Sequence, residues 1–178
     1  MGEEWITDLD HIRRLAEREE REDIGFRMFV KGDIGCSDEE LDAMVWQALA
    51  EVAPAIDCLA CANCCRVMRA GVTGEEIERL APRLGLSVEE FRRLHIVVDW
   101  GEEYIETSPC PFLEGNRCVV YEDRPEVCRE YPHLHKPDFS FRTISLLGSV
   151  AVCPIVFNVW RLLKDRTGYW RSRYDIEE

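Results

Sequence analysis

Basic residues are scarce in this chain. Its 22 Lys and Arg residues stand against 35 Asp and Glu residues, which gives a formal net charge of -13. Binding to nucleic acid or to anionic lipid depends on basic side chains that replace counterions at phosphate groups. The composition therefore argues against a nucleic-acid partner and against a membrane partner.

The chain also lacks an apolar leader and an unbroken apolar segment. Its first eight residues are acidic and contain no hydrophobic stretch of the kind found in signal peptides. Residues 143–160 carry no charge over about the length that spans a bilayer, but Pro154 would interrupt a helix in mid-membrane. We interpret this segment as buried core and expect a soluble, cytoplasmic protein.

No internal repeat, linker or low-complexity tract divides the sequence. Hydrophobic residues make up 46% and charged residues 32% of its 178 residues, as in ordinary globular domains. We predict a single compact domain over residues 1–178. Within it we expect a helical part at 1–54, a cysteine-cluster region at 55–160, and a helix end with a charged tail at 161–178.

Helix signals dominate the sequence. Residues 6–30 show the irregular apolar period of a partly exposed helix. Three more helices are expected to begin at capping boxes, in which Ser or Thr precedes Glu by three residues. These pairs are Ser37 with Glu40, Thr73 with Glu76, and Ser87 with Glu90. Gly85 stands where a glycine ends a helix, and Pro154 opens a last helix that should lead into a charged tail from Lys164.

Strand signals are few and short. Residues 96–106 place β-branched and aromatic residues on both sides of a Gly turn, which predicts a hairpin. Residues 118–121 predict another short strand, and Asp123 is expected to cap a helical turn with Pro125 near its start. The predicted fold class is mainly α with a small β-hairpin and short strands, an α+β fold.

Cysteine is the abundant exception, with nine residues. Eight of them fall into two sets of four: Cys58, Cys61, Cys64 and Cys65 in a tight run, then Cys110, Cys118, Cys128 and Cys153 downstream. A zinc ion takes four tetrahedral ligands and a cubane iron–sulfur cluster takes four thiolates, and a two-residue spacing lets thiolates converge. We predict that these eight hold zinc or iron, with a 4Fe–4S cluster as one form, and that the metal stabilises the domain.

The adjacent pair Cys64 and Cys65 raises a geometric question, because neighbouring side chains diverge on a helix or a strand. If the run is helical, Cys58, Cys61 and Cys65 share one face and Cys64 turns aside. One cysteine of the pair would then serve a second site.

Other interpretations of the cysteines stay open. A disulfide framework suits a secreted chain, and a role as small buried hydrophobes suits Cys36. A redox-active pair at Cys61 and Cys64 has the right spacing, but no βαβ pattern of the thioredoxin type surrounds it.

Basic and imidazole side chains gather near the cysteines. Four arginines lie close in sequence: Arg66, Arg69, Arg124 and Arg129. Arg66 and Arg129 directly follow cluster cysteines, so we expect their charge to compensate the thiolates around the metal. His133 and His135 could also bind metal, although eight thiolates already complete two tetrahedral sites.

The cysteine motifs resemble those of the YkgJ-type cysteine-cluster proteins, which are described as zinc- or iron-chelating domains with a C-x-x-C-x-x-C-C signature. The resemblance covers about residues 55–160 and rests on these segments: Cys58-Leu-Ala-Cys61-Ala-Asn-Cys64-Cys65, Cys110-Pro111-Phe112-Leu113, Cys118-Val-Val-Tyr121, Cys128-Arg129 and Cys153-Pro154. It implies metal chelation, and it leaves the choice between zinc and iron open.

The resemblance does not supply a reaction. A related cluster in the flagellin lysine methylases, which look like iron–sulfur enzymes that use S-adenosylmethionine, offers redox or methyl-transfer chemistry as an alternative. This chain has neither a C-x-x-x-C-x-x-C motif nor a Gly-rich nucleotide loop. A metal-handling or interaction module that passes its ion to a protein partner is the third interpretation.

Overall fold

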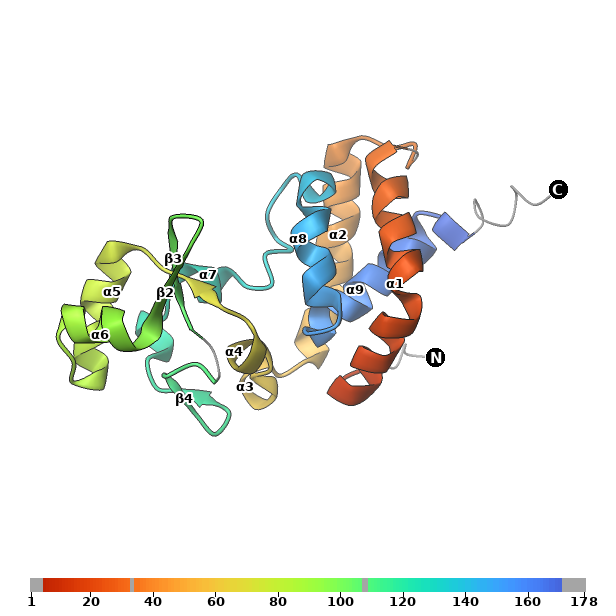
Figure 1. The fold of residues 1–178 in the computed structure, drawn as a ribbon. Coiled ribbons are helices and arrows are strands. Elements are labelled where there is room, and N and C mark those ends of the chain that lie inside the picture. The colour runs from red at the N-terminus through yellow and green to blue at the C-terminus, as the bar shows by residue number, and fades with distance from the viewer. Residues whose placement is uncertain (1–4, 33, 107–108, 171–178) are drawn as a thin grey trace. The chain divides into compact units, whose positions relative to one another are not determined.

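The structure is a computed structural model that describes residues 5–32, 34–106 and 109–170 (Figure 1). Its internal contacts divide the chain into two compact units. The helical unit comprises Met1–Ile56 and Pro132–Glu178, and the cysteine unit comprises Asp57–Tyr131. Long helices in one unit and short antiparallel strands in the other confirm the predicted α+β class. The single metal-stabilised domain stays a prediction.

Among its described residues, the helical unit contains four α-helices, and Figure 1 shows them packed side by side. They are α1 (Leu9–Gly32), α2 (Asp38–Val52, followed by a 3₁₀ turn at Ala53–Ala55), α8 (Phe139–Val150) and α9 (Pro154–Arg166). Trp160 lies in the core, with the rings of Phe26 and Phe139 at centroid distances of 5.1 and 6.0 Å. The Ser37–Glu40 capping box at the start of α2 is confirmed.

The predicted start of the charged tail at Lys164 is wrong, because Lys164 is fully buried. Its Nζ lies 2.6 Å from Oε1 of Glu22 and 2.5 Å from Oδ1 of Asp23, on α1. Lys164 follows Trp160 by four residues and so shares the inward face of α9. Trp160 Nε1 donates to the same Asp23 oxygen at 3.0 Å. Burial raises the pKa of Asp23, and the hydrogen bond and charge of Lys164 oppose that rise.

The uncharged segment at 143–160 is divided between two helices. Helix α8 ends at Val150 and α9 begins at Pro154, and every residue from Cys153 to Trp160 is buried. The interpretation of this segment as core is therefore confirmed for residues 153–160, whereas Ile144, Ser145 and Gly148 on α8 are exposed. Within the described ranges, no single helix is long and apolar enough to cross a membrane. One pair of consecutive segments, Asp38–Ala55 and Cys58–Val67, reaches that length and apolar composition only when the two are combined.

The cysteine unit alternates short helices and strands. Its helices are α3 (Cys58–Cys61), α4 (Cys64–Val67), α5 (Gly74–Leu80), α6 (Val88–His95) and α7 (Glu126–Glu130), with 3₁₀ turns at Ala81–Leu84 and Tyr121–Asp123. Its strands are β1 (Ala70–Gly71), β2 (Ile96–Asp99), β3 (Glu102–Ile105), β4 (Leu113–Glu114) and β5 (Arg117–Cys118). They form an antiparallel sheet in the order β1-β3-β2 and a separate pair β4-β5.

The predicted hairpin is present as β2 and β3. Its two turn residues, Trp100 and Gly101, have φ of 51° and 86°, which is the left-handed conformation that two-residue hairpin turns require. The capping boxes at Thr73 and Ser87 are also confirmed, as is the left-handed Gly85 at φ 70°.

Two local predictions between residues 118 and 125 are wrong. The strand ends at Cys118, because the chain turns at once into the 3₁₀ segment Tyr121–Asp123. Helix α7 begins after Pro125 without a side-chain cap, and Asp123 forms an ion pair with Arg83 instead. The same helix does carry Cys128, as expected.

A small apolar core supports the cysteine unit. It consists of Ile77, Leu80, Ala81, Phe91, Ile105, Phe112 and Val120. Cys110 and Cys118 are partly buried and pack against this cluster. The core thereby fixes the position of two predicted metal ligands.

Candidate metal centre

The C-x-x-C-x-x-C-C run is two short helices rather than one. Asp57 caps α3 by accepting hydrogen bonds from the N–H groups of Leu59 and Ala60, at 2.9 and 3.1 Å. Ala62 then adopts a left-handed conformation with φ 47°, which ends α3, and α4 begins at Cys64. The condition for the predicted split of the run, a continuous helix, is therefore not met.

Cys64 and Cys65 lie close together at the start of α4, with their Sγ atoms 4.0 Å apart. Two thiolates on one tetrahedral zinc ion are about 3.8 Å apart when each Zn–S bond is about 2.3 Å long. The expectation that adjacent cysteine side chains diverge is wrong here. The pair is spaced to share one centre.

Backbone hydrogen bonds connect α4 to the downstream cysteines. The N–H of Cys110 donates to the carbonyl of Cys65 at 3.0 Å, and the N–H of Leu113 donates to the carbonyl of Cys110 at 2.9 Å. Leu113 is in turn the strand partner of Cys118. This chain of contacts connects Cys65 with Cys110 and Cys118, which lie more than forty residues later in the sequence.

Helix α7 adds Cys128 to the same region. Its first N–H, from Glu126, donates to Oε1 of Glu76 at 2.8 Å, and Glu76 also closes the capping box of α5. One glutamate therefore anchors α7 to α5. The thiol of Cys128 interacts electrostatically with those of Cys65, Cys110 and Cys118.

The thiols of this group differ in acidity. A hydrogen bond from Cys64 lowers the pKa of Cys65 to about 6, with a further lowering from the charge of Arg66 that burial opposes. Burial raises the pKa of Cys110 to about 11, and the charges of Cys65 and Cys118 add to the rise. Cys65 is thus the thiol best prepared to act as a thiolate.

Burial also raises the pKa of Cys118 and, more strongly, of Cys128. Solvent reaches part of the Cys128 residue, so the protein packed around its thiol, rather than complete enclosure, causes this rise. Metal binding must release these protons, because the thiolate is the ligand.

The thiols do not form a finished coordination shell. In the part of the chain that the structure describes, no three His, Cys, Asp or Glu side chains are placed to hold a metal ion together. The electrostatic interaction of Cys128 with Cys65, Cys110 and Cys118 acts over longer distances than a metal–sulfur bond. These thiols therefore lie in one region, but their sulfurs are not arranged around a common centre. A set of four sulfur donors suits tetrahedral zinc or an iron–sulfur cluster, so the chemistry of the donors fits the expected metals.

The remaining cysteines fall into three places. Cys58 is exposed and Cys61 half-buried on α3, and burial, followed by the charges of Cys61 and Asp57, raises the pKa of Cys58. Cys153 is buried at the start of α9, in the helical unit. Cys36 lies before α2 in that unit. The cysteine unit therefore contains seven of the eight predicted ligands.

Arg66 connects the cysteine run to the turn between β4 and β5. Its guanidinium donates to the carbonyls of Cys61 and Gly115, at 3.1 and 2.9 Å, and to the side chain of Asn116. Asn116 donates in return to the carbonyl of Ala60 at 2.6 Å. Arg66 thus has two effects, since it positions α3 and also lowers the pKa of Cys65.

The other arginines act differently from one another. Arg129 donates to the carbonyls of Arg124 and Glu122, at 3.0 and 2.8 Å, and so closes the turn before α7. Arg124 stacks on the ring of Tyr121 at 3.7 Å, and its charge lowers the pKa of Cys118 and Cys128. Arg69 pairs with acidic residues of the hairpin. Arginine charge therefore acts on three thiols: Arg66 on Cys65, and Arg124 on Cys118 and Cys128.

The two histidines that follow Cys128 in sequence are placed outside the cysteine unit. His133 and His135 both belong to the helical unit, where His133 has a left-handed φ of 63°. The cysteine unit itself contains seven thiols and the single histidine His95.

An α+β unit with seven thiols on short, hydrogen-bonded elements defines a cysteine-cluster protein. Comparison with family models agrees with that class: the CxxCxxCC model, described as "Putative zinc- or iron-chelating domain", matches residues 57–145. The chain belongs to this CxxCxxCC family. The membership supports metal ions as its ligands. Neither a curated protein nor a solved structure matches the chain.

Proposed function

We propose that the chain binds zinc or iron through thiolates of the cysteine unit, and that the main ligands are Cys65, Cys110, Cys118 and Cys128. The observation that supports this best is the hydrogen-bonded connection from Cys65 through Cys110 to the β4–β5 pair, which holds Cys118. It joins cysteines more than forty residues apart in the sequence, and the small core fixes two of them.

The neighbouring groups suit thiolate ligands. Arg66 and Arg124 place positive charge near the sulfurs, which reduces the cost of bringing several thiolates together. Cys64, at 4.0 Å from Cys65, is available as a further ligand. Cys58, Cys61 and, in the helical unit, Cys153 complete the eight that the sequence predicts. A bound metal would crosslink the short elements and supply folding free energy to the unit.

Solvent access to the proposed ligands favours a metal-handling version of this function over a purely structural one. Cys58 and Cys128 are exposed and Cys118 lines an open groove, so part of the proposed centre faces solvent. A ligand that solvent can reach is also one that can be exchanged. The iron–sulfur-dependent redox or methyl-transfer alternative requires iron, and the metal content separates it from the zinc version.

The test is a count of zinc, iron and sulfide per chain in protein purified without oxygen. Zinc without sulfide would support a carrier or structural centre, and iron with sulfide would support a cluster on thiolates. Protein that stays free of both metals, even after refolding in their presence, would refute the proposal.

Two cysteine variants show whether the centre is placed correctly. Cys65→Ser should lower metal content and should reduce stability by more than the roughly 0.5 kcal/mol typical of a surface substitution. Cys36→Ser is the matched control in the helical unit and should keep its full metal content. Loss of metal in the control, or none in Cys65→Ser, would mean that the ligands are wrongly assigned.

A further inference from the structure

A tryptophan at the turn of the β2–β3 hairpin is the most exposed large hydrophobic residue among those that the structure describes. Trp100 is 99% exposed, and Val98, two residues before it, is 67% exposed. The indole ring therefore adds nothing to the core. It does not suit the turn either, because Trp100 has a φ of 51°, which Asn, Asp or Gly adopts with less strain. A bulky apolar side chain that strains the backbone and lies wholly in solvent indicates a contact with another molecule.

Acidic side chains flank Trp100 on both sides. Asp99 precedes it and pairs with Arg69 at 3.7 Å. Glu102 follows the turn, is exposed, and forms no ion pair with any residue that the structure describes. The hairpin tip, residues 98–102, therefore presents an aromatic ring beside a carboxylate. It suits a site that has an apolar wall and a cation.

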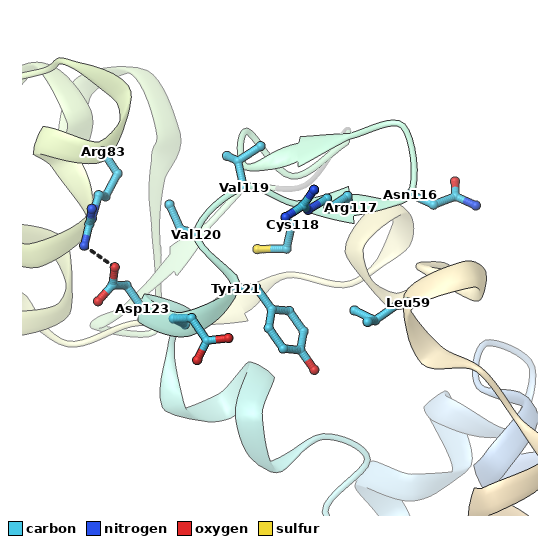
Figure 2. A pocket seen from close by; sticks show the side chains of 10 residues that line it. Leu59, Arg83, Asn116, Arg117, Cys118, Val119, Val120, Tyr121 and Asp123 are labelled. Atoms are coloured by element: carbon cyan, nitrogen blue, oxygen red, sulfur yellow. Dashed lines mark hydrogen bonds and ion pairs between the residues drawn. The ribbon is translucent and has the colours of Figure 1, made fainter.

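The cysteine unit itself contains such a site, an open groove of about 730 Å³. Leu59, Val119 and Tyr121 form its apolar wall, with 52%, 45% and 39% of their surface exposed. Figure 2 shows these side chains among those around the groove. The volume lies within the roughly 300–1,000 Å³ of sites that hold a small molecule, so an indole ring fits.

The charges of the groove complement those of the hairpin tip. Two arginines and two acidic residues line it, so the groove is balanced in a chain whose net charge is -13. Arg83 is paired with Asp123. Arg117 is exposed and has no ion-pair partner within the described ranges, although Glu122 lines the same groove. An acidic tip therefore meets less repulsion here than on an acidic surface, and Arg117 is ready to pair with a carboxylate.

The hairpin tip and the groove lie on different sides of the cysteine unit. Figure 1 shows the turn between β2 and β3 and the β4–β5 pair at opposite ends of that unit. Trp100 therefore does not reach the groove of its own chain. The partner that carries both the matching ring and the matching carboxylate is a second copy of the chain.

We infer that the hairpin tip of one copy of this chain docks in the groove of another copy. The indole of Trp100 packs against the apolar wall, and Glu102 pairs with Arg117. The contact involves no metal ion, so it does not depend on the proposed function.

The contact is small. A tryptophan side chain buries about 150–250 Å², whereas a stable interface buries roughly 1,200–2,000 Å² in total. We therefore expect weak self-association, with a dissociation constant on the order of 10–100 µM. Because the tip and the groove are different surfaces, one variant can lose the tip while another loses the groove.

Sedimentation velocity measures this association on the whole chain as purified, under reducing conditions and at concentrations that bracket the expected dissociation constant. Trp100→Ala should weaken the association about thirtyfold or more, as expected for the aromatic anchor of an interface. Arg117→Glu should weaken it about tenfold or more, because it places a carboxylate opposite Glu102. Adding Glu102→Arg to Arg117→Glu should restore it.

Two matched controls should associate as the unaltered chain does. Trp46→Ala removes a tryptophan of the helical unit that is 44% exposed. Arg93→Glu reverses the charge of an exposed arginine of the cysteine unit that does not line the groove. A control that associates as poorly as Trp100→Ala would overturn the inference.

Mixing the two defective variants tests the contact directly. Trp100→Ala keeps its groove and Arg117→Glu keeps its tip, so an equimolar mixture should form a complex with about the affinity of the unaltered contact. A mixture that stays monomeric would overturn the inference, and so would an unaltered chain that is monomeric throughout. Monomeric protein that contains zinc or iron would refute this inference alone, and associating protein free of both metals would refute the proposed function alone.

Discussion

Replacing Lys164 by Met should destabilise the helical unit strongly. The substitution keeps an unbranched side chain of similar length, so it creates little empty space, but it removes the cation that lies beside Asp23 and Glu22. The Lys164 and Asp23 side chains are only 1% and 8% exposed. Asp23 would be left with the Trp160 N–H as its remaining hydrogen-bond donor. Breaking a buried ion pair from one side costs about 3–5 kcal/mol, and we expect a loss of that size at neutral pH.

The pH dependence gives this prediction a sign. Burial raises the pKa of Asp23 in the folded chain above its ordinary value of 3.8. Protonated Asp23 therefore favours the folded state at low pH, and this contribution is lost as pH rises through the folded pKa. Removing Lys164 takes away an interaction that lowers this pKa, so the pKa rises further. The deficit of Lys164→Met should be largest near neutral pH and should shrink as Asp23 becomes protonated.

Urea unfolding followed by tryptophan fluorescence measures the effect, because Trp160 lies in the same cluster. The free energy of unfolding of variant and unaltered chain is compared at about pH 7 and about pH 4.5, on either side of the expected change. Asp23→Asn added to Lys164→Met should recover part of the loss at the higher pH. A deficit below about 1 kcal/mol, or one independent of pH, would refute this account of the buried pair.

Two further predictions concern the cysteine unit. Removal of metal by a strong chelator should abolish the protection of the backbone amides of residues 57–131 against hydrogen exchange, while the amides of α1 and α9 stay protected. Unchanged protection in both units would contradict a fold that depends on metal. Glu76→Ala should lower the free energy of unfolding by about 1 kcal/mol more than Glu90→Ala, which removes the matching glutamate of the other capping box. Of the two variants, only Glu76→Ala should also lower metal affinity, because Glu76 accepts a hydrogen bond from the N–H of Glu126 as well. Equal results for the two variants in urea unfolding and in metal titration would contradict this role of Glu76.

Signals within a few residues of one another predicted much of the fold. The three capping boxes depend on a side chain and an N–H group three residues apart, so the sequence contains all the information they require. The hairpin between residues 96 and 105 is equally local. Metal binding followed from the types and spacing of the cysteines, which family membership supports.

Contacts between distant segments set what the sequence could not predict. Strand β1 is two residues long, too short for a period, and exists because β3 pairs with it. Lys164 looks like the start of a charged tail until α1 supplies two carboxylates to it. Asp123 was expected to cap a helix, but Arg83, forty residues earlier, takes its side chain. In each case a partner far away in the sequence overrides the local preference.

The cysteine run shows the same limit at the candidate site. A C-x-x-C-x-x-C-C spacing predicts ligands, but the directions of the thiols depend on Ala62, which adopts a left-handed conformation that alanine rarely takes. Nothing in the sequence signals that break. It ends α3 and lets Cys64 and Cys65 begin a new helix with their sulfurs 4.0 Å apart, and Arg66 and Asn116 hold α3 against the β4–β5 turn from outside.

Cys118 both packs against the core of the cysteine unit and lines an open groove. It packs against the small core of the unit, so its backbone position is set by Phe112 and its neighbours rather than by a metal. Its sulfur also lines the groove, where solvent and a ligand can reach it. If Cys118 binds metal as proposed, its thiolate could leave the metal and return without loss of the structure that the core holds in place. Exchange at Cys118 would therefore disturb the fold less than exchange at exposed Cys58, which lies outside that core on the single turn of α3.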